Sequence, residues 1–301
     1  MALFKLGKQR NDEMRSVVNS SKTLLANIRF MDVDNPVRTM AITSSVPNEG
    51  KTFVAANLAS AIATSGKTVL LVECDMRRRS MSRALGVHAQ HGIYSVMSKE
   101  CDLLEAAVAT PTPNLYFLDS EPRIPNPSDL LNSHRFTRLI EQARNMYDYV
   151  VFDTPPVGTF IDAAVLGTKV DAVFMVVREG FTRKAEMVAA AEQLRKSGCN
   201  LAGAIMNYCE LSNGSYSYYY EYYSRDEASS NEGPKLTPVA QRPERKAAAP
   251  AGSDTEMATS VPTAPPARPA RGSHATKPAE DTDVYEQLAE QVYDASRDEE
   301  F

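Results

Sequence analysis

The sequence predicts an α/β fold in which a mostly parallel sheet is covered by helices on both faces. Short runs such as TVLLVE and YVVFD are apolar almost throughout, which is typical of strands buried on both faces. Stretches with helical spacing lie between these runs, and parallel strands need such crossover connections. The alternation of the two patterns therefore indicates a doubly wound sheet.

The expected elements follow in chain order. The first is a helix over residues 11–30, which has Val17, Leu24, Leu25 and Ile28 on or near one face. Later helices are expected over residues 53–63 and 182–198, the second ending at a C-cap glycine. Strands are expected over residues 39–43, 68–73, 114–119, 149–153, 172–177 and 201–207.

The composition divides the chain near residue 224. The whole chain has 301 residues and a formal net charge of −5. Residues 224–301 contain 9 Lys and Arg against 15 Asp and Glu, and they hold nine of the eighteen prolines. Such a segment buries too little apolar surface to offset its chain entropy, so we expect it to be disordered. The predicted parts are an N-terminal helical segment (1–35) suited to oligomerisation, a core (36–210), a tyrosine cluster (211–223) and an acidic Pro- and Ala-rich tail (224–301).

One stretch of the tail has a helical pattern. Within residues 283–297, Val284, Leu288 and Val292 recur every four residues. The stretch is too acidic for a membrane surface. A solvated nascent helix is the simpler interpretation, and a peptide that docks on a partner is the alternative.

Composition also excludes several classes of protein. The tail carries a net charge of −6, which leaves about +1 on the first 223 residues and no basic field for nucleic acid. No run of about 18 apolar residues predicts a membrane span, and the start MALFKLGKQR is not a signal peptide. Cys74, Cys101, Cys199 and Cys209 have no metal or disulfide spacing, so we expect free, buried thiols. These observations together predict a soluble, cytoplasmic chain.

The segment SSVPNEGKT, residues 44–52, carries the strongest chemical signal. It follows the first expected strand and opens a helix, where main-chain N–H groups, a helix N-terminus and a lysine converge on phosphate. Lys51 would reach the β- and γ-phosphates, and the Thr52 hydroxyl would bind Mg²⁺. Ser45 stands where the strict pattern has its first glycine. The expected ATP-binding residues are Ser45, Val46, Pro47, Asn48, Glu49, Gly50, Lys51, Thr52, Phe53 and, at the end of the last strand, Asn207.

Carboxylates follow two further expected strands. LLVECDMRR supplies Glu73 and Asp75, and VVFDTPP supplies Asp153. Ligands of an open parallel sheet bind at the carboxyl ends of its strands, and Mg²⁺ prefers oxygen ligands. We therefore predict a magnesium site formed by Thr52 and by carboxylates from these two strand ends.

The three segments together resemble the Walker A, Walker A′ and Walker B motifs of the bacterial tyrosine kinases of capsule and exopolysaccharide assembly. The resemblance extends from about residue 23 to 223 and includes TLLANIRF and IPNPSDLLNS. It implies a P-loop fold of the MinD/ParA type and ATP-dependent phosphorylation of tyrosine, first on the chain itself. It also implies that Lys51 binds the phosphates. Thr52, Asp75 and Asp153 are the metal ligands that it implies, with Asp75 on the metal or accepting the phenol proton. The predicted catalytic residues are Lys51, Asp75 and Glu73.

The sequence departs from the family pattern at two places. Walker A′ usually reads Asp-x-Asp, and Glu73 moves the first carboxylate by one methylene. Because a 1 Å misplacement can cost about 100-fold in rate, slow catalysis is one consequence to test. The family's N-terminal Glu-x-x-Arg-x-x-Arg aligns with Asn19, Lys22 and Leu25, which argues against ring assembly by the usual ion pairs.

The segment SYSYYYEYY, residues 215–223, fits the same interpretation. A phenol has a pKa of about 10 and is a poor nucleophile until it meets a base, so several tyrosines in one segment raise the chance of a productive pose. Each phosphate adds a charge of about −1.5 to −2. The predicted acceptors are Tyr216, Tyr218, Tyr219, Tyr220, Tyr222 and Tyr223. An adhesive aromatic patch is the alternative.

Two other functions compete with the kinase. A MinD/ParA-like switch ATPase would carry a second lysine early in the phosphate loop, and residues 45–49 contain none. An ATP-bound scaffold with impaired turnover is the third candidate. For the kinase, the resemblance implies a separate transmembrane activator or polysaccharide co-polymerase, a homo-oligomer, a tyrosine phosphatase and substrates in sugar-nucleotide metabolism. It further implies recruitment of the cytoplasmic kinase to the inner face of the membrane.

Overall fold

The computed structural model describes residues 2–31 and 34–209. The tyrosine cluster, the tail and the helix expected at 283–297 lie outside the described residues. The strands are β1 (Thr39–Ser44), β2 (Val69–Glu73), β3 (Val108–Ala109), β4 (Leu115–Leu118), β5 (Tyr149–Asp153), β6 (Ala172–Arg178) and β7 (Leu201–Asn207). The helices are α1 (Ala2–Met31), α2 (Lys51–Thr64), α3 (Met81–Ala84), α4 (Ile93–Ser98), α5 (Leu103–Ala106), α6 (Pro127–Asn132), α7 (His134–Met146), α8 (Asp162–Gly167) and α9 (Lys184–Lys196).

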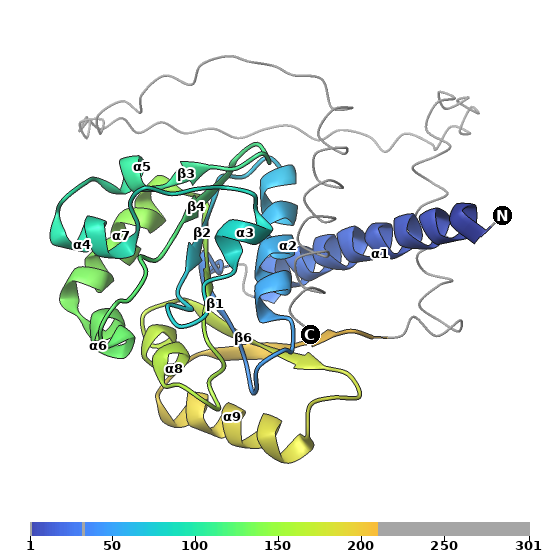
Figure 1. Cartoon of the computed structure of the whole chain (residues 1–301). Coiled ribbons are helices and arrows are strands. Elements are labelled where there is room, and N and C mark those ends of the chain that lie inside the picture. The colour runs from blue at the N-terminus through green and yellow to red at the C-terminus, as the bar shows by residue number, and fades with distance from the viewer. Residues whose placement is uncertain (1, 32–33, 210–301) are drawn as a thin grey trace, which may run out of the picture. The chain divides into compact units, whose positions relative to one another are not determined.

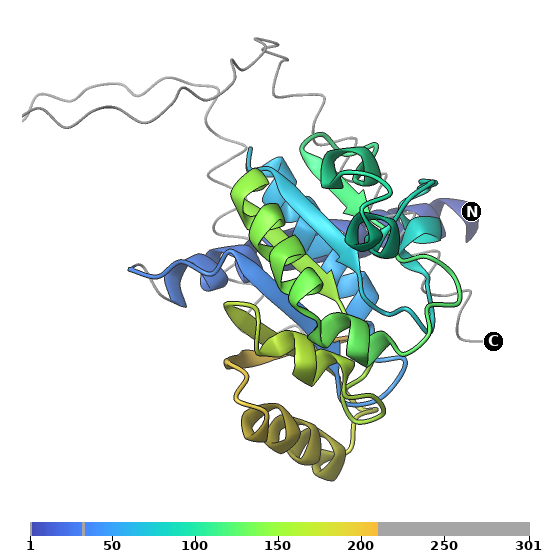
Figure 2. The ribbon, with the colours of Figure 1, turned by 90° about the vertical axis from the view of Figure 1, so that its left-hand side faces the viewer.

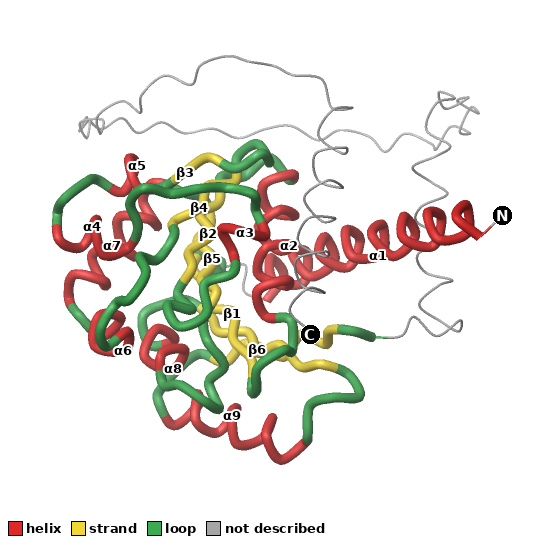
Figure 3. The backbone as a smooth tube through the Cα atoms, viewed as in Figure 1, coloured by secondary structure: helices red, strands yellow, loops and turns green. Residues whose placement is uncertain are grey.

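The described strands form one sheet in the order β3-β4-β2-β5-β1-β6-β7 (Figures 1 and 3). All neighbouring strands are parallel except β3, which pairs antiparallel with β4. The order places β1 between β5 and β6, with β2 beyond β5. The predicted α/β class with a mostly parallel, doubly wound sheet is confirmed.

Two helical layers cover the sheet (Figures 1 and 2). Side chains alternate between the faces of a strand, so Met40 and Ile42 of β1 enter one apolar cluster and Ala41 enters the other. The first cluster includes residues of α1, α2 and α3, and the second includes residues of α4 to α9. Burial on both faces explains why the strands read as continuous apolar runs.

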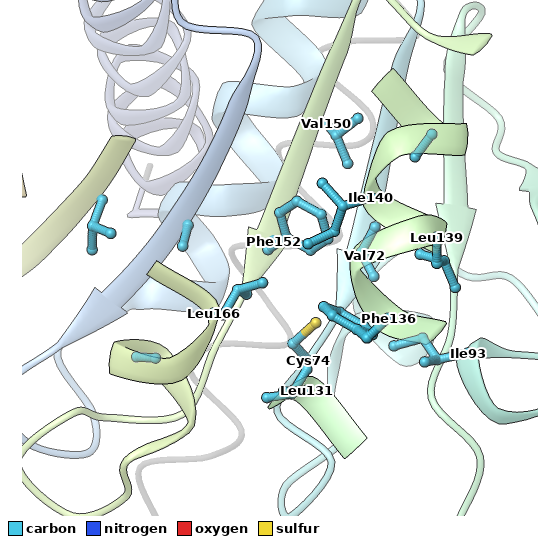
Figure 4. Packing of buried hydrophobic residues seen from close by; sticks show 14 of the residues in the cluster. Val72, Cys74, Ile93, Leu131, Phe136, Leu139, Ile140, Val150, Phe152 and Leu166 are labelled. Atoms are coloured by element: carbon cyan, nitrogen blue, oxygen red, sulfur yellow. The ribbon is translucent and has the colours of Figure 1, made fainter. Parts of the chain in front are cut away.

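In the second cluster, the rings of Phe136 and Phe152 pack near each other among aliphatic side chains (Figure 4). Phe136 of α7 and Phe152 of β5 are both fully buried, and their ring centroids lie 6.4 Å apart in a tilted arrangement. Cys74, Leu131 and Ile140 lie among the residues of the same cluster. Because β5 ends in Asp153, this packing fixes the strand that carries one of the predicted magnesium ligands.

Several expectations needed correction. The predicted strands agree with the observed ones to within one residue at each end, but the first helix begins at Ala2 rather than residue 11. Helix α7 was missed, although its apolar residues 136, 139, 140 and 143 have helical spacing. The two-residue strand β3 has no pattern long enough to recognise. All four cysteines are free thiols, as expected, but Cys101 is only partly buried and Cys209 is exposed.

At the amino-terminal ends of β1 and β6, Asp171 connects several elements through hydrogen bonds. Its carboxylate accepts main-chain N–H groups of Thr39 (2.8 Å) and Arg38 (3.0 Å) and the Arg144 guanidinium (2.7 Å). Burial by itself raises the pKa of Asp171, but these hydrogen bonds together hold it below its usual 3.8. The start of β1 is thereby tied to α7 and to the turn before β6.

Within residues 2–31 and 34–209, no helix combines the length and the hydropathy that crossing a bilayer requires.

We expect the Phe136→Ala variant to lose about 3 to 5 kcal/mol of unfolding free energy, because the cavity removes ring contacts from a closed core. Urea denaturation measures the loss. The matched control is Leu104→Ala, whose side chain is 72% exposed and whose change should stay within about 0.5 kcal/mol. Equal effects of the two substitutions would contradict the packing described here.

The Asp171→Asn variant should be less stable than the wild type near neutral pH, with a gap that closes in acid. The folded pKa lies below the unfolded value, so the stabilisation exists above the unfolded pKa and disappears as pH falls through the folded one. Thermal unfolding measured from pH 7 down to pH 3 should show the two melting temperatures converge below the ordinary value of 3.8. A gap independent of pH would show that the charge of Asp171 is not what stabilises this edge.

Candidate active site

Three loops from distant parts of the sequence meet at the carboxyl edge of the sheet. They follow β1, β2 and β5, which are neighbours in the order β2-β5-β1. Glu73 at the end of β2 is in register with Asp153 at the end of β5, and Asp153 is in register with Ile42 of β1. Parallel pairing thus brings the predicted phosphate loop and both predicted carboxylate segments together.

The phosphate loop ends at a glycine that no other residue could replace without a shift. Gly50 has φ +83°, and α2 begins at the next residue. A Cβ added to Gly50 would lie 2.1 Å from Nδ2 of Asn207. That same amide donates a hydrogen bond to the carbonyl of Glu49 (3.0 Å). Asn207, predicted as an ATP-binding residue, therefore lies directly against the loop.

The side chain of Glu49 stabilises the conformation of the phosphate loop through hydrogen bonds within it. Its carboxylate is fully buried and accepts hydrogen bonds from the main-chain N–H of Val46 (2.8 Å) and the Ser45 hydroxyl (3.0 Å). The hydroxyl of Thr182, in the loop after β6, also donates to it. Of the other predicted loop residues, Phe53 packs against the apolar cluster of α1 and α2. The side chain of Glu49 thus shapes the cradle, and Thr182 is a support that sequence analysis missed.

Lys51 lies in the middle of the acidic groups. Its Nζ is 3.0 Å from Oδ2 of Asp75 and 3.3 Å from Oγ1 of Thr52. Burial by itself lowers the pKa of Lys51, but the negative charges of Asp153, Asp75 and Glu73 together raise it above its usual value. The lysine is therefore held in its charged form, which is the form that binds phosphate.

Thr52 and Asp153 form the pair best suited to hold a cation. Oγ1 of Thr52 donates a 2.7 Å hydrogen bond to Oδ2 of Asp153, and Asp153 is fully buried. No group of three or more His, Cys, Asp or Glu side chains in the described part of the chain could hold a metal by itself. Mg²⁺ at phosphoryl-transfer sites takes one or two carboxylates plus waters and substrate phosphates, so these residues fit it.

Glu73 stabilises the loop that follows β2 through hydrogen bonds to main-chain N–H groups. Its carboxylate accepts main-chain N–H groups of Met81 (2.9 Å) and Ser80 (3.2 Å), where the short helix α3 begins. Burial and the negative charge of Asp153 raise the pKa of Glu73 well above its usual value. Of the two predicted catalytic carboxylates, Glu73 thus contacts main-chain N–H groups, and Asp75 contacts Lys51.

Arginines close the site from two sides. Nη1 of Arg78 donates to the Asn48 side-chain oxygen, and Nη1 of Arg178 donates to the Asn48 carbonyl, each at 3.2 Å. The Arg178 guanidinium also lies 4.0 Å from the ring centroid of Tyr208, directly after β7. Arg79 instead forms a 2.6 Å ion pair with Asp119. The sequence holds no local signal for the partners of these arginines.

Comparisons with known proteins agree with this geometry. A family model described as an AAA domain matches residues 37–190. The tyrosine-protein kinase YwqD of Bacillus subtilis is 39% identical over 199 residues, which cover 66% of this chain and 84% of YwqD. This chain belongs to the tyrosine-protein kinase family.

Solved structures share this fold. The kinase domain of the Escherichia coli tyrosine kinase ETK has a TM-score of 0.62 at 31% identity, covering 67% of this chain and 79% of that one. MinD of Pyrococcus horikoshii, complexed with Mg-ADP, has a TM-score of 0.50 at 24% identity, covering 58% of this chain and 72% of that one. The second likeness bears on the fold alone, and it agrees with the predicted P-loop fold of the MinD type.

Helix α1 of this tyrosine kinase carries the positions that align with the family's N-terminal Glu-x-x-Arg-x-x-Arg, namely Asn19, Lys22 and Leu25. Leu25 is 4% exposed and packs with Ile28 in the cluster that includes α2. Asn19 and Lys22 are exposed. The position of the family's second arginine therefore faces the core, and its side chain is not available for an ion pair with another copy.

The Gly50→Ala variant should bind ATP at least about tenfold more weakly, because an L-residue is strained at this φ and its Cβ meets Asn207. Titration with a fluorescent ATP analogue measures the affinity. The matched control is Gly66→Ala, which has φ +80° but nothing within 4 Å of an added Cβ. It carries the same backbone strain far from the loop and should keep its affinity. Equal affinities of both variants would contradict the assigned cradle.

Proposed function

We propose that this tyrosine kinase transfers the γ-phosphate of Mg-ATP to the tyrosines of its own cluster, and that it thereby regulates capsular or exopolysaccharide synthesis and export. One observation carries the proposal. Lys51, Asp75, Thr52 and Asp153 come from three separate strand ends and form one chain of contacts of 2.7 to 3.3 Å. Such a set suits phosphoryl transfer, where positioning and charge supply most of the catalysis.

Each residue of the set has a defined part in the reaction. Lys51, held in its charged form, would move from Asp75 to the incoming β- and γ-phosphates. Thr52 and Asp153 would hold Mg²⁺, which when bound neutralises charge on those phosphates. The phenol oxygen forms a bond to the γ-phosphorus, the bond to the β–γ bridging oxygen breaks, and ADP leaves. Asp75, released from Lys51, accepts the phenol proton.

The predicted acceptors start close along the chain to this site. Asn207 at the end of β7 contacts the phosphate loop, and Tyr216 follows nine residues later. Nine residues of extended chain span at most about 30 Å. This span lets the cluster reach a site near the end of β7, in its own chain or in a copy beside it. On the family resemblance we propose that Tyr216, Tyr218, Tyr219, Tyr220, Tyr222 and Tyr223 enter the site of another copy, which requires a homo-oligomer.

The remaining parts of the proposal rest on the family. A cytoplasmic kinase recruited to the inner face of the membrane would meet a transmembrane activator or polysaccharide co-polymerase as a separate chain. A tyrosine phosphatase would reset the cluster, and enzymes of sugar-nucleotide metabolism would be further substrates. The near-neutral charge of residues 1–223 supports the absence of a nucleic-acid partner. The absence of a lysine at residues 45–49 counts against a switch ATPase.

We expect the purified full chain, incubated with Mg-ATP, to carry phosphate on residues 216–223 by mass spectrometry. Lys51→Ala should reduce the rate at least about 100-fold, because it removes the charge that stabilises the transferred phosphate. The matched control is Lys67→Ala: the exposed Lys67 lies 3.8 Å from Asp148 and should be dispensable. ATP hydrolysis without phosphotyrosine would favour the switch ATPase. ATP binding with neither activity would favour a scaffold.

A further inference from the structure

The turn that follows β6 contacts the phosphate loop on the side away from the carboxylates of β2 and β5. In the order β2-β5-β1-β6-β7, β6 is the neighbour of β1 on that side. The turn spans residues 178–182, and α9 begins two residues after it. We call it the β6 turn. It contributes none of the residues assigned above to ATP or Mg²⁺.

Hydrogen bonds within the β6 turn hold the Thr182 side chain in place. The main-chain N–H groups of Phe181 (3.3 Å) and Thr182 (3.1 Å) donate to the carbonyl of Arg178. In return, the hydroxyl oxygen of Thr182 accepts the main-chain N–H of Arg178 at 3.0 Å. Because a hydroxyl also carries one proton that it can donate, the fixed Thr182 side chain has a donor to offer to a neighbouring segment.

The acceptor of this proton is the buried carboxylate of Glu49 in the phosphate loop. The Thr182 hydroxyl donates to Oε1 of Glu49, whose side chain is fully buried. The other printed partners of this carboxylate, the Ser45 hydroxyl (3.0 Å) and the Val46 main-chain N–H (2.8 Å), belong to the loop itself. No ion pair between the described residues includes Glu49. Within the described part of the chain, hydrogen bonds alone therefore stabilise this carboxylate, and Thr182 supplies the one that comes from outside the loop.

The β6 turn contacts the phosphate loop at a second, adjacent residue. Nη1 of Arg178 donates to the carbonyl of Asn48 (3.2 Å), a residue with φ +65°. The Arg178 guanidinium lies 5.0 Å from the ring centroid of Phe181, within the same turn. Asn48 and Glu49 directly precede Gly50, where the main-chain N–H groups expected to bind phosphate begin. The turn therefore contacts the loop at the two residues that set the direction of these N–H groups.

We infer that Thr182 is a positioning residue for ATP binding, which acts through Glu49 on the phosphate loop. This inference deepens the proposed function and rests on the ATP binding in it. A buried carboxylate that loses a donor is costly, so without the Thr182 hydroxyl Glu49 shifts toward another donor or toward water. Because Glu49 also holds Ser45 and Val46, its shift changes the loop conformation. The loop must then be reordered when ATP binds, and this cost lowers the affinity.

The affinity of the full-length chain for Mg-ATP tests the inference, with a fluorescent ATP analogue as the probe. Thr182→Val keeps the shape of the side chain but removes the hydroxyl, and it should raise the Kd about fivefold or more. Thr182→Ser keeps the hydroxyl and should stay within about twofold of the wild type. The matched control is Thr168→Val. The exposed Thr168 hydroxyl donates to the carbonyl of Val165 (2.9 Å), and its loss should leave the Kd unchanged.

A double-mutant cycle shows whether Thr182 acts through Glu49. In Glu49→Gln, the amide has a single acceptor oxygen, which the Val46 N–H requires, so the Thr182 proton loses its acceptor. This variant alone should raise the Kd, and Thr182→Val added to it should change the Kd by less than about twofold. Effects of the two substitutions that multiply independently would overturn the coupling through Glu49.

Melting temperatures of the same variants separate positioning from folding. A lower melting temperature for Thr182→Val with an unchanged Kd would show a structural role only, and it would overturn the inference while leaving the kinase function intact. Failure of the wild type to bind Mg-ATP would overturn the proposed function and the inference with it. If Thr182→Val does not fold, Thr182→Ala compared with Thr182→Ser isolates the same oxygen atom. Equal Kd values for that pair would reject the inference.

Discussion

The structure depends on placing several carboxylates around one lysine in a buried site. Glu73, Asp75 and Asp153 are each at most 3% exposed, and charges removed from water cost several kcal/mol apiece unless they are paired. The charge of Lys51, the hydroxyl of Thr52 and main-chain N–H groups offset this cost. An excess of negative groups nevertheless remains. Burial raises the pKa of Glu73, and the negative charge of Asp153 raises it further. A divalent cation would neutralise part of this negative charge. The buried carboxylates that destabilise the empty site therefore favour the binding of Mg²⁺ together with a triphosphate.

Both loops at this edge are shaped by the same device, a buried glutamate that accepts main-chain N–H groups. Glu49 organises the phosphate loop, and Glu73 organises the loop after β2. Between them Asn48, at φ +65°, receives a hydrogen bond from Arg78 on one side and from Arg178 on the other. Strained backbone of this kind persists only where surrounding contacts over-determine it. The cradle is therefore set by the protein before nucleotide arrives, which lowers the reorganisation needed at the moment of transfer.

The fold was largely predictable because its strands are buried on both faces and therefore read as apolar runs. The residues at their carboxyl ends could be assigned to one edge without knowing the strand order, which explains why Lys51, Thr52, Asp75 and Asp153 were found together. Contacts between loops could not be foreseen. Thr182 reaches Glu49 and Asp162 reaches Arg77 across 133 and 85 residues of sequence, and neither pair has a local pattern. Helix α7 is different, since its apolar spacing was readable and was overlooked.

The glutamate that replaces the usual aspartate at position 73 acquires a physical reason in this arrangement. Its carboxylate contacts the main-chain N–H groups of residues seven and eight positions further on, and the extra methylene adds reach toward them. The added length is thus directed into the loop that leads to α3. With Glu73 holding the loop, Asp75 is positioned through its contacts with Lys51 and with the main-chain N–H of Arg78 (3.0 Å). In the proposed function this leaves Asp153 and Thr52 to bind the metal, which would suit an ion that keeps most of its own water.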